Sequence, residues 1–217
     1  RDVIISNKIK SLEDLKGKNY QEIAEYVIQP FVSKKISNLE LKNILKKTYE
    51  GFDTSDVASL ININKNQFIL ELFHGPTFAF KDYALQFLGN LFSHCLKNSQ
   101  KKITVLGATS GDTGSAAIEA FKGKENVKVF ILHPYGRVSA VQRKQMTTIL
   151  DENINNIAVK GTFDDCQKIV KELFNDDKFR SKINMSGVNS INWARIVCQI
   201  VYYFYSYFKI KKENISF

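Results

Sequence analysis

The stretch "KITVLGATSGDTGSAAIEAF", residues 102–121, decides the fold class. Its first part is short, apolar and β-branched, which is typical of a buried strand. Its last part carries small and apolar residues at helical spacing, and a loop rich in Gly, Ser and Thr joins the two parts. A strand that passes through a glycine loop into a helix is the opening of a βαβ unit, in which the two strands run parallel.

The same order recurs along the chain. The segments 127–146 ("VKVFILHPYGRVSAVQRKQM") and 153–174 ("NINNIAVKGTFDDCQKIVKELF") each pass from a strand to a helix. Upstream, "FILELF" (68–73) precedes the loop "HGPT" and a helix expected from about Asp82 to Lys97. This order predicts an α/β fold in which helices flank a parallel sheet, with ligands at the carboxyl ends of the strands.

The beginning and the end of the chain are more helical. Residues 1–66 are expected to form a mainly helical N-terminal region, in which Ser37 and Glu40 form a capping box. Residues 67–217 are expected to form the α/β region. Its last segment, 188–208, is a polar loop that leads into an apolar helix, and this helix is too short and too polar to span a bilayer.

The charge pattern argues against a nucleic-acid-binding protein. The formal net charge is +9, and the many lysines are spread along the chain instead of being clustered. Only five basic residues are arginines, which makes each a candidate for binding a planar anionic group. The three cysteines have no metal or redox spacing, so a reducing cytoplasm is the expected compartment.

Lys81 is the most unusual charged residue. It follows the apolar run Phe78–Phe80 at the expected start of a helix. Lysines often lie in such a place with the amine in water. Here, however, partial burial and the positive end of the helix dipole both disfavour the charged form. A neutral amine is what a Schiff-base lysine requires.

The loop 109–114 ("TSGDTG") is the second candidate. Free amides and hydroxyls at a helix N-terminus suit an anionic group, although an ordinary capped connection has about even odds. The glycine spacing is neither that of a dinucleotide-binding loop nor that of a Walker A loop. Arg137 and Arg143 lie near a strand end, where they are suited to bind a phosphate or to form surface ion pairs. His74 and His133 are expected to cap turns, and the scattered histidines predict no metal site.

Five motifs together resemble the threonine synthase family, in its bacterial and fungal branch. They are "LFHGPTFAFKD", "GATSGDTGSAA", "GRVSAVQRKQMTT", "GTFDDCQKIV" and "SGVNSINWARI", in this order. The resemblance implies a fold-type-II, tryptophan synthase beta-like fold and the cofactor pyridoxal 5'-phosphate. It also implies conversion of O-phospho-L-homoserine and water to L-threonine and phosphate, as part of threonine biosynthesis.

By the same resemblance, Lys81 matches the lysine that forms the Schiff base with the cofactor and then moves protons on the substrate. Asn189 and Asn192, together with Ser190, are expected near the cofactor. The substrate is expected to bind Thr109, Ser110, Gly111, Asp112 and Thr113, with its phosphate at Arg195 or, as second choices, at Lys144 or Arg143.

The family's glycine-rich loop for the cofactor phosphate has no counterpart here, so the chain is expected to be part of a longer protein. Three alternatives remain open. A threonine-synthase-like phospholyase would release a keto acid, and a non-catalytic relative would act as a binding module. A basic nucleic-acid-binding domain would show steeply salt-dependent DNA affinity.

Overall fold

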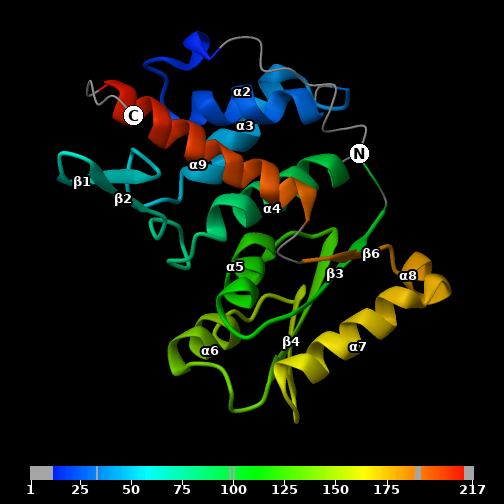
Figure 1. Cartoon of the computed structure of the whole chain (residues 1–217). Helices are drawn as coiled ribbons and strands as arrows, with labels where there is room; N and C mark the ends of the chain where they lie inside the picture. The colour runs from blue at the N-terminus through cyan, green and yellow to red at the C-terminus, as the bar shows by residue number, and fades with distance from the viewer. Residues whose placement is uncertain (1–11, 33, 98, 100, 189–191, 213–217) are drawn as a thin grey trace. The chain divides into compact units, whose positions relative to one another are not determined.

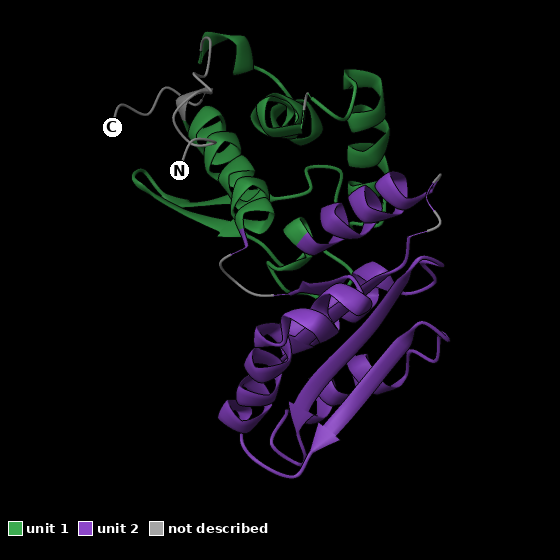
Figure 2. Cartoon of the chain, turned by 90° about the vertical axis from the view of Figure 1, so that its right-hand side faces the viewer, with its two compact units in different colours: residues 1–84, 193–217 green, residues 85–192 purple. Residues whose placement is uncertain are grey.

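The structure is a computed structural model that describes residues 12–32, 34–97, 99, 101–188 and 192–212. The chain forms two compact units, shown in different colours in Figure 2. Unit 1 contains residues 1–84 and 193–217, and unit 2 contains residues 85–192.

Unit 2 is built on a parallel sheet of four strands. They are β3 (Ile103–Ala108), β4 (Val127–Pro134), β5 (Ile154–Val159) and β6 (Met185–Gly187). Their order is β5-β4-β3-β6, and every neighbouring pair is parallel. The parallel α/β fold predicted from the sequence is therefore confirmed.

Helices cover both faces of this sheet. One face packs against α7 (Phe163–Asn175), where Leu106 and Leu132 form a core cluster with Cys166. On the other face, Ile131 lies under Gly114 of α5 (Asp112–Phe121). Neighbouring residues of a strand point to opposite faces of the sheet, so Ile131 faces α5 and Leu132 faces α7. Figure 1 shows α5 and α7 on opposite sides of the sheet.

Three further helices belong to unit 2 wholly or in part. They are α6 (Ala140–Thr147), α8 (Asp177–Lys182) and most of α4 (Asp82–Leu96), whose bounds agree with the predicted helix. Gly89 of α4 approaches the backbone of Ala120 in α5 so closely that a Cβ at residue 89 would overlap the carbonyl oxygen of Ala120. A glycine is therefore required where these two helices cross.

Unit 1 is mainly helical. It contains η1 (Glu13–Leu15), α2 (Tyr20–Val32), α3 (Asn38–Tyr49), α9 (Trp193–Lys212) and the start of α4. Helix α2 packs against both α3 and α9.

The capping box predicted before α3 is present. The Ser37 N–H donates to Glu40 Oε2 at 2.8 Å, and the Glu40 N–H donates to Ser37 Oγ at 3.3 Å. The core beside it is aromatic. The rings of Tyr20 and Tyr49 have centroids 5.1 Å apart, and Tyr205 from α9 lies 5.2 Å from Tyr20.

One strand differs from the prediction. The segment expected as a strand of the parallel sheet, "FILELF", is β2 (Gln67–Glu71), and it pairs antiparallel with β1 (Ser59–Asn64) in a separate two-stranded sheet. The reason is local: β1 precedes it by only two residues, and such a short connection joins antiparallel neighbours.

The apolar helix predicted at the end of the chain is α9. Several of its residues, including Val197, Cys198 and Val201, are buried in the core. No helix in the described ranges combines the length and the hydropathy that a bilayer crossing requires.

Candidate active site

The strand order in unit 2 marks one edge of the sheet as the place for a ligand. From β3 the chain moves to β4 and β5 on one side, whereas β6 lies on the other side of β3. The order therefore reverses between β3 and β6, and ligands of open α/β sheets bind at the carboxyl ends of strands at such a switch point. Thr109–Gly111, which was predicted as a site loop, follows β3, and Val188 follows β6.

Thr109 organises the first of these loops. Its side chain is 2% exposed, and Oγ1 accepts hydrogen bonds from the N–H groups of Gly111 at 3.0 Å and Gly114 at 2.9 Å. The hydroxyl also donates to the Gly111 carbonyl at 3.1 Å. Its bonding capacity is thus largely used inside the loop. Ser110, by contrast, is exposed, and Asp112 and Thr113 are half-buried in the first turn of α5.

Helix α6 supports the glycines of this loop. A Cβ at Gly111 would overlap the side chain of Gln142, with 2.6 Å to Cδ, and a Cβ at Gly114 would lie 2.8 Å from Met146 Sδ. Gln142 was not singled out from the sequence. Gly111 precedes Gln142 by 31 residues, and the sequence around the glycine does not indicate which distant side chain would cover it.

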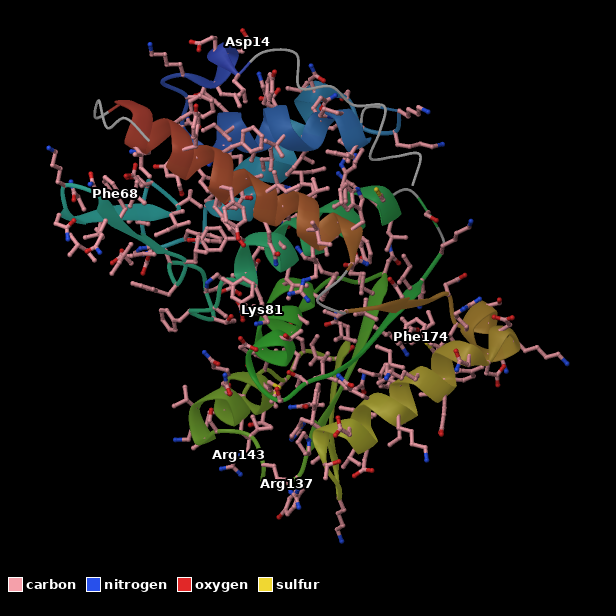
Figure 3. The ribbon with its side chains drawn as sticks, viewed as in Figure 1. Asp14, Phe68, Lys81, Arg137, Arg143 and Phe174 are labelled. Carbon is pink, nitrogen blue, oxygen red and sulfur yellow. The ribbon has the colours of Figure 1, made fainter. Side chains whose placement is uncertain are left out.

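The cationic residues of unit 2 that were predicted to bind a phosphate lie on its surface. Arg143 and Lys144 of α6 are exposed, and so is Arg137 in the preceding loop. Figure 3 shows Arg137 and Arg143 at the same end of unit 2. Asn192 is half-buried and directly precedes α9, whereas Asn189 and Ser190 lie outside the described residues.

The motif "GTFDDCQKIV" has a structural role after β5. Thr162 and Asp165 form a capping box in which the Thr162 N–H and hydroxyl both donate to Asp165 Oδ2, at 2.6 and 2.8 Å. These bonds lower the pKa of Asp165. Gly161 leaves room for the carboxylate, since a Cβ there would lie 2.7 Å from Oδ2. This motif begins helix α7, and Cys166 anchors the helix in the core.

Unit 1 carries Lys81. The residue immediately precedes α4, as predicted, and its side chain is half-buried (Figure 3). Its Nζ lies 4.2 Å from the centroid of the Phe80 ring, a distance at which an ammonium group and an aromatic face attract each other. The loop before it is held by Asp82, whose carboxylate accepts two hydrogen bonds from Thr77.

His74 begins that loop and does more than cap a turn. Its Nδ1 lies 2.7 Å from Asp53 Oδ1, and its Nε2 lies 2.9 Å from Glu71 Oε2. Partial burial alone would lower the pKa of His74, but the hydrogen bonds to Glu71 and Asp53 raise it overall. Both ring nitrogens face carboxylate oxygens, so the protonated imidazolium, which donates from both nitrogens, fits this place best.

Arg195, in the first turn of α9, is only 1% exposed. Its burial distinguishes it from Arg143 and Lys144, the other candidates for the substrate phosphate, because these two are open to solvent. A phosphate group reaches Arg195 only by entering the protein, where a guanidinium–phosphate pair is stronger than at the surface.

Comparisons with known proteins place this chain in an enzyme family. Residues 61–213 match the family described as "Pyridoxal-phosphate dependent enzyme", and residues 4–49 match "Threonine synthase N terminus". The chain belongs to the family of pyridoxal-phosphate dependent enzymes, whose cofactor is pyridoxal phosphate.

Its relatives within the family include threonine synthases. The chain is 54% identical to the threonine synthase of Pseudomonas aeruginosa, over 88% of this chain and 40% of that protein. It is 50% identical to the Saccharomyces cerevisiae enzyme, with the same coverage. A crystal structure of PLP-bound threonine synthase from Brucella melitensis is 45% identical with a TM-score of 0.86, and it covers 94% of this chain and 44% of the other. The chain thus spans less than half the length of these relatives, and its fold is the one that they share.

One described residue of unit 1 fits the aldehyde of this cofactor. Lys81 supplies an amine at the end of a loop that is fixed by buried hydrogen bonds.

Proposed function

We propose that the complete protein is a threonine synthase that converts O-phospho-L-homoserine and water to L-threonine and phosphate. The observation that carries this proposal is the 54% identity to the Pseudomonas aeruginosa threonine synthase along 88% of the chain. The resemblance includes "HGPTFAFKD", the motif that contains Lys81.

Lys81 is the catalytic residue of this proposal. Pyridoxal phosphate, when bound, withdraws electrons from the bonds at the substrate Cα. Lys81 would hold the cofactor at its aldehyde carbon, and the lysine amine, when free, would move protons at Cα and Cβ of the substrate. Its half-buried side chain directly precedes α4, at the end of the loop that the bonds between Thr77 and Asp82 hold.

The loop after β3 is proposed to bind the substrate carboxylate. The hydroxyl of Ser110 is exposed, and the first turn of α5 begins with Asp112 and Thr113. Backbone amides at such a helix start favour an anion. Thr109 contributes by holding the loop in shape, because its hydroxyl already bonds Gly111 and Gly114.

The substrate phosphate is proposed to bind Arg195, with Arg143 or Lys144 as the alternatives, and Asn189 and Asn192 are proposed to contact the cofactor. Replacing Arg195 by Lys turns a bidentate fork into a point charge. We expect this change to raise KM for O-phospho-L-homoserine more than it lowers kcat. Unchanged kinetics would remove Arg195 from the site.

The product distinguishes this function from that of a phospholyase. Full-length protein loaded with pyridoxal phosphate is incubated with O-phospho-L-homoserine, and phosphate, threonine and keto acid are measured together. A threonine synthase releases threonine and phosphate in equal amounts. Keto acid in place of threonine would contradict the proposal, and so would the absence of any phosphate release.

A further inference from the structure

The loop between β2 and α4 contains an unfavourable backbone conformation. Phe78 has φ of 58°, in the left-handed region, which is unfavourable for a bulky residue. Turns lie on both sides of it: the Phe78 N–H donates to the Gly75 carbonyl at 3.0 Å, and the Asp82 N–H donates to the Ala79 carbonyl at 2.9 Å. Such a conformation persists only where neighbouring contacts fix it.

The carboxylate of Asp82 provides these contacts. Its Oδ2 accepts the Thr77 N–H at 2.8 Å, and its Oδ1 accepts the Thr77 hydroxyl at 2.7 Å. Asp82 is fully buried and Thr77 is 8% exposed. Hydrogen bonds to an ionised acceptor are strong, and a low local dielectric strengthens them further. The negative charge also lies in the first turn of α4, where the helix dipole favours it.

Gly75 completes this arrangement. A Cβ at residue 75 would lie 2.5 Å from Asp82 Cβ and 2.7 Å from Asp82 Oδ2, so only glycine allows the carboxylate to approach. We call Gly75, Thr77 and Asp82 the Asp82 clamp. All three residues belong to the segment "HGPTFAFKD".

Lys81 lies inside the segment that the clamp closes, between Thr77 and Asp82. It directly precedes Asp82 and is enclosed by the turn from Ala79 to Asp82. The clamp therefore fixes the backbone from which the Lys81 side chain extends. We propose that Asp82 is the positioning residue for Lys81, acting through Thr77, so that the amine meets the cofactor aldehyde without rearrangement of the loop. This proposal rests on the proposed role of Lys81 in bonding that aldehyde.

Two substitutions at Thr77 separate positioning from general stability. Thr77→Val removes the hydroxyl that donates to Asp82 but keeps the shape and the backbone amide, whereas Thr77→Ser keeps the hydroxyl. Full-length protein is titrated with pyridoxal phosphate and reduced with borohydride, and the labelling of Lys81 is quantified by peptide mapping. Binding of pyridoxamine phosphate, which has no aldehyde, is measured in parallel, and the melting temperature of each variant is recorded.

We expect Thr77→Val to raise the pyridoxal phosphate concentration for half-maximal labelling about tenfold, which corresponds to the loss of one hydrogen bond to a charged group. Its affinity for pyridoxamine phosphate is expected to stay within about twofold, because that ligand does not need the lysine. Thr77→Ser restores labelling. Asp82→Asn, which keeps the shape of the side chain, is expected to act in the same direction as Thr77→Val.

The proposal is overturned if Thr77→Val and Asp82→Asn label Lys81 as readily as the unaltered protein does. It is also overturned if both ligands lose affinity equally, since the clamp would then only stabilise the fold. Should Thr77→Val not fold, the comparison of both ligands with Asp82→Asn decides. A failure of the unaltered protein to label Lys81 would instead refute the proposed function.

Discussion

The substitution Thr109→Val tests how the loop at the switch point is held together. Valine has nearly the shape of threonine but has no hydroxyl, so the Gly111 and Gly114 amides both lose an acceptor. Gly114 keeps a second acceptor, because its N–H also lies 3.1 Å from the Gly111 carbonyl. The destabilisation is therefore expected mainly from the buried N–H of Gly111, because an unsatisfied buried donor costs about 1–3 kcal/mol.

Hydrogen exchange measures this effect directly. A loss of about 2 kcal/mol in local stability corresponds to about 30-fold faster exchange of the Gly111 amide, if the loop opens locally. The control is Thr109→Ser, which keeps the oxygen and removes a methyl group worth about 0.8 kcal/mol. We expect Thr109→Ser to retain protection at Gly111. Equal protection in Thr109→Val and the unaltered protein would show that the hydroxyl does not hold the loop.

Two further substitutions test packing and charge. Gly89→Ala is expected to destabilise the protein by about 1–3 kcal/mol in urea unfolding, because the new Cβ overlaps the Ala120 carbonyl. This loss is expected although alanine is the better helix former. The control is Gly51→Ala, whose Cβ meets no atom within 4 Å, and equal effects of the two substitutions would refute the packing argument. The raised pKa of His74 means that its charge stabilises the fold fully below the ordinary value of 6.5, and that this contribution is lost as the pH rises through the raised pKa. The advantage in melting temperature over His74→Gln is therefore expected to shrink as the pH rises above 6.5, and a constant difference would contradict this reasoning.

Much of the fold follows from local patterns in the sequence. The β-branched runs before glycine loops gave the three long parallel strands, and the spacing of apolar residues after Lys81 gave α4 with nearly its observed bounds. The Ser37 to Glu40 capping box was also correct. These features depend on residues only a few positions apart, and for that reason a single sequence contains them.

Contacts between distant residues were not predictable in this way. The strand pattern of residues 68–73 does not show which partner it takes, and β1 proved to be that partner. Nothing in α9 indicates that it packs on α2, far earlier in the chain. The three long strands of the parallel sheet, in contrast, were predictable, because a helix follows each of them.

In the candidate site, the sequence identified the residue types but not what their side chains contact. The sequence does not show, for example, that the Thr109 hydroxyl accepts hydrogen bonds from the Gly111 and Gly114 amides. Asp82 was predicted only as the start of a helix. Its bonds to Thr77 span five residues and run backward from the helix, unlike the three-residue spacing of a capping box.

The chemical identity of the lysine that bonds the cofactor is the most direct test of the whole account. Full-length protein is mixed with pyridoxal phosphate, reduced with borohydride and digested, and the modified peptide is sequenced by mass spectrometry. We expect a single pyridoxyl group on Lys81, and none in a Lys81→Ala variant that keeps its circular dichroism spectrum. A modification on any other lysine, or none at all, would contradict it.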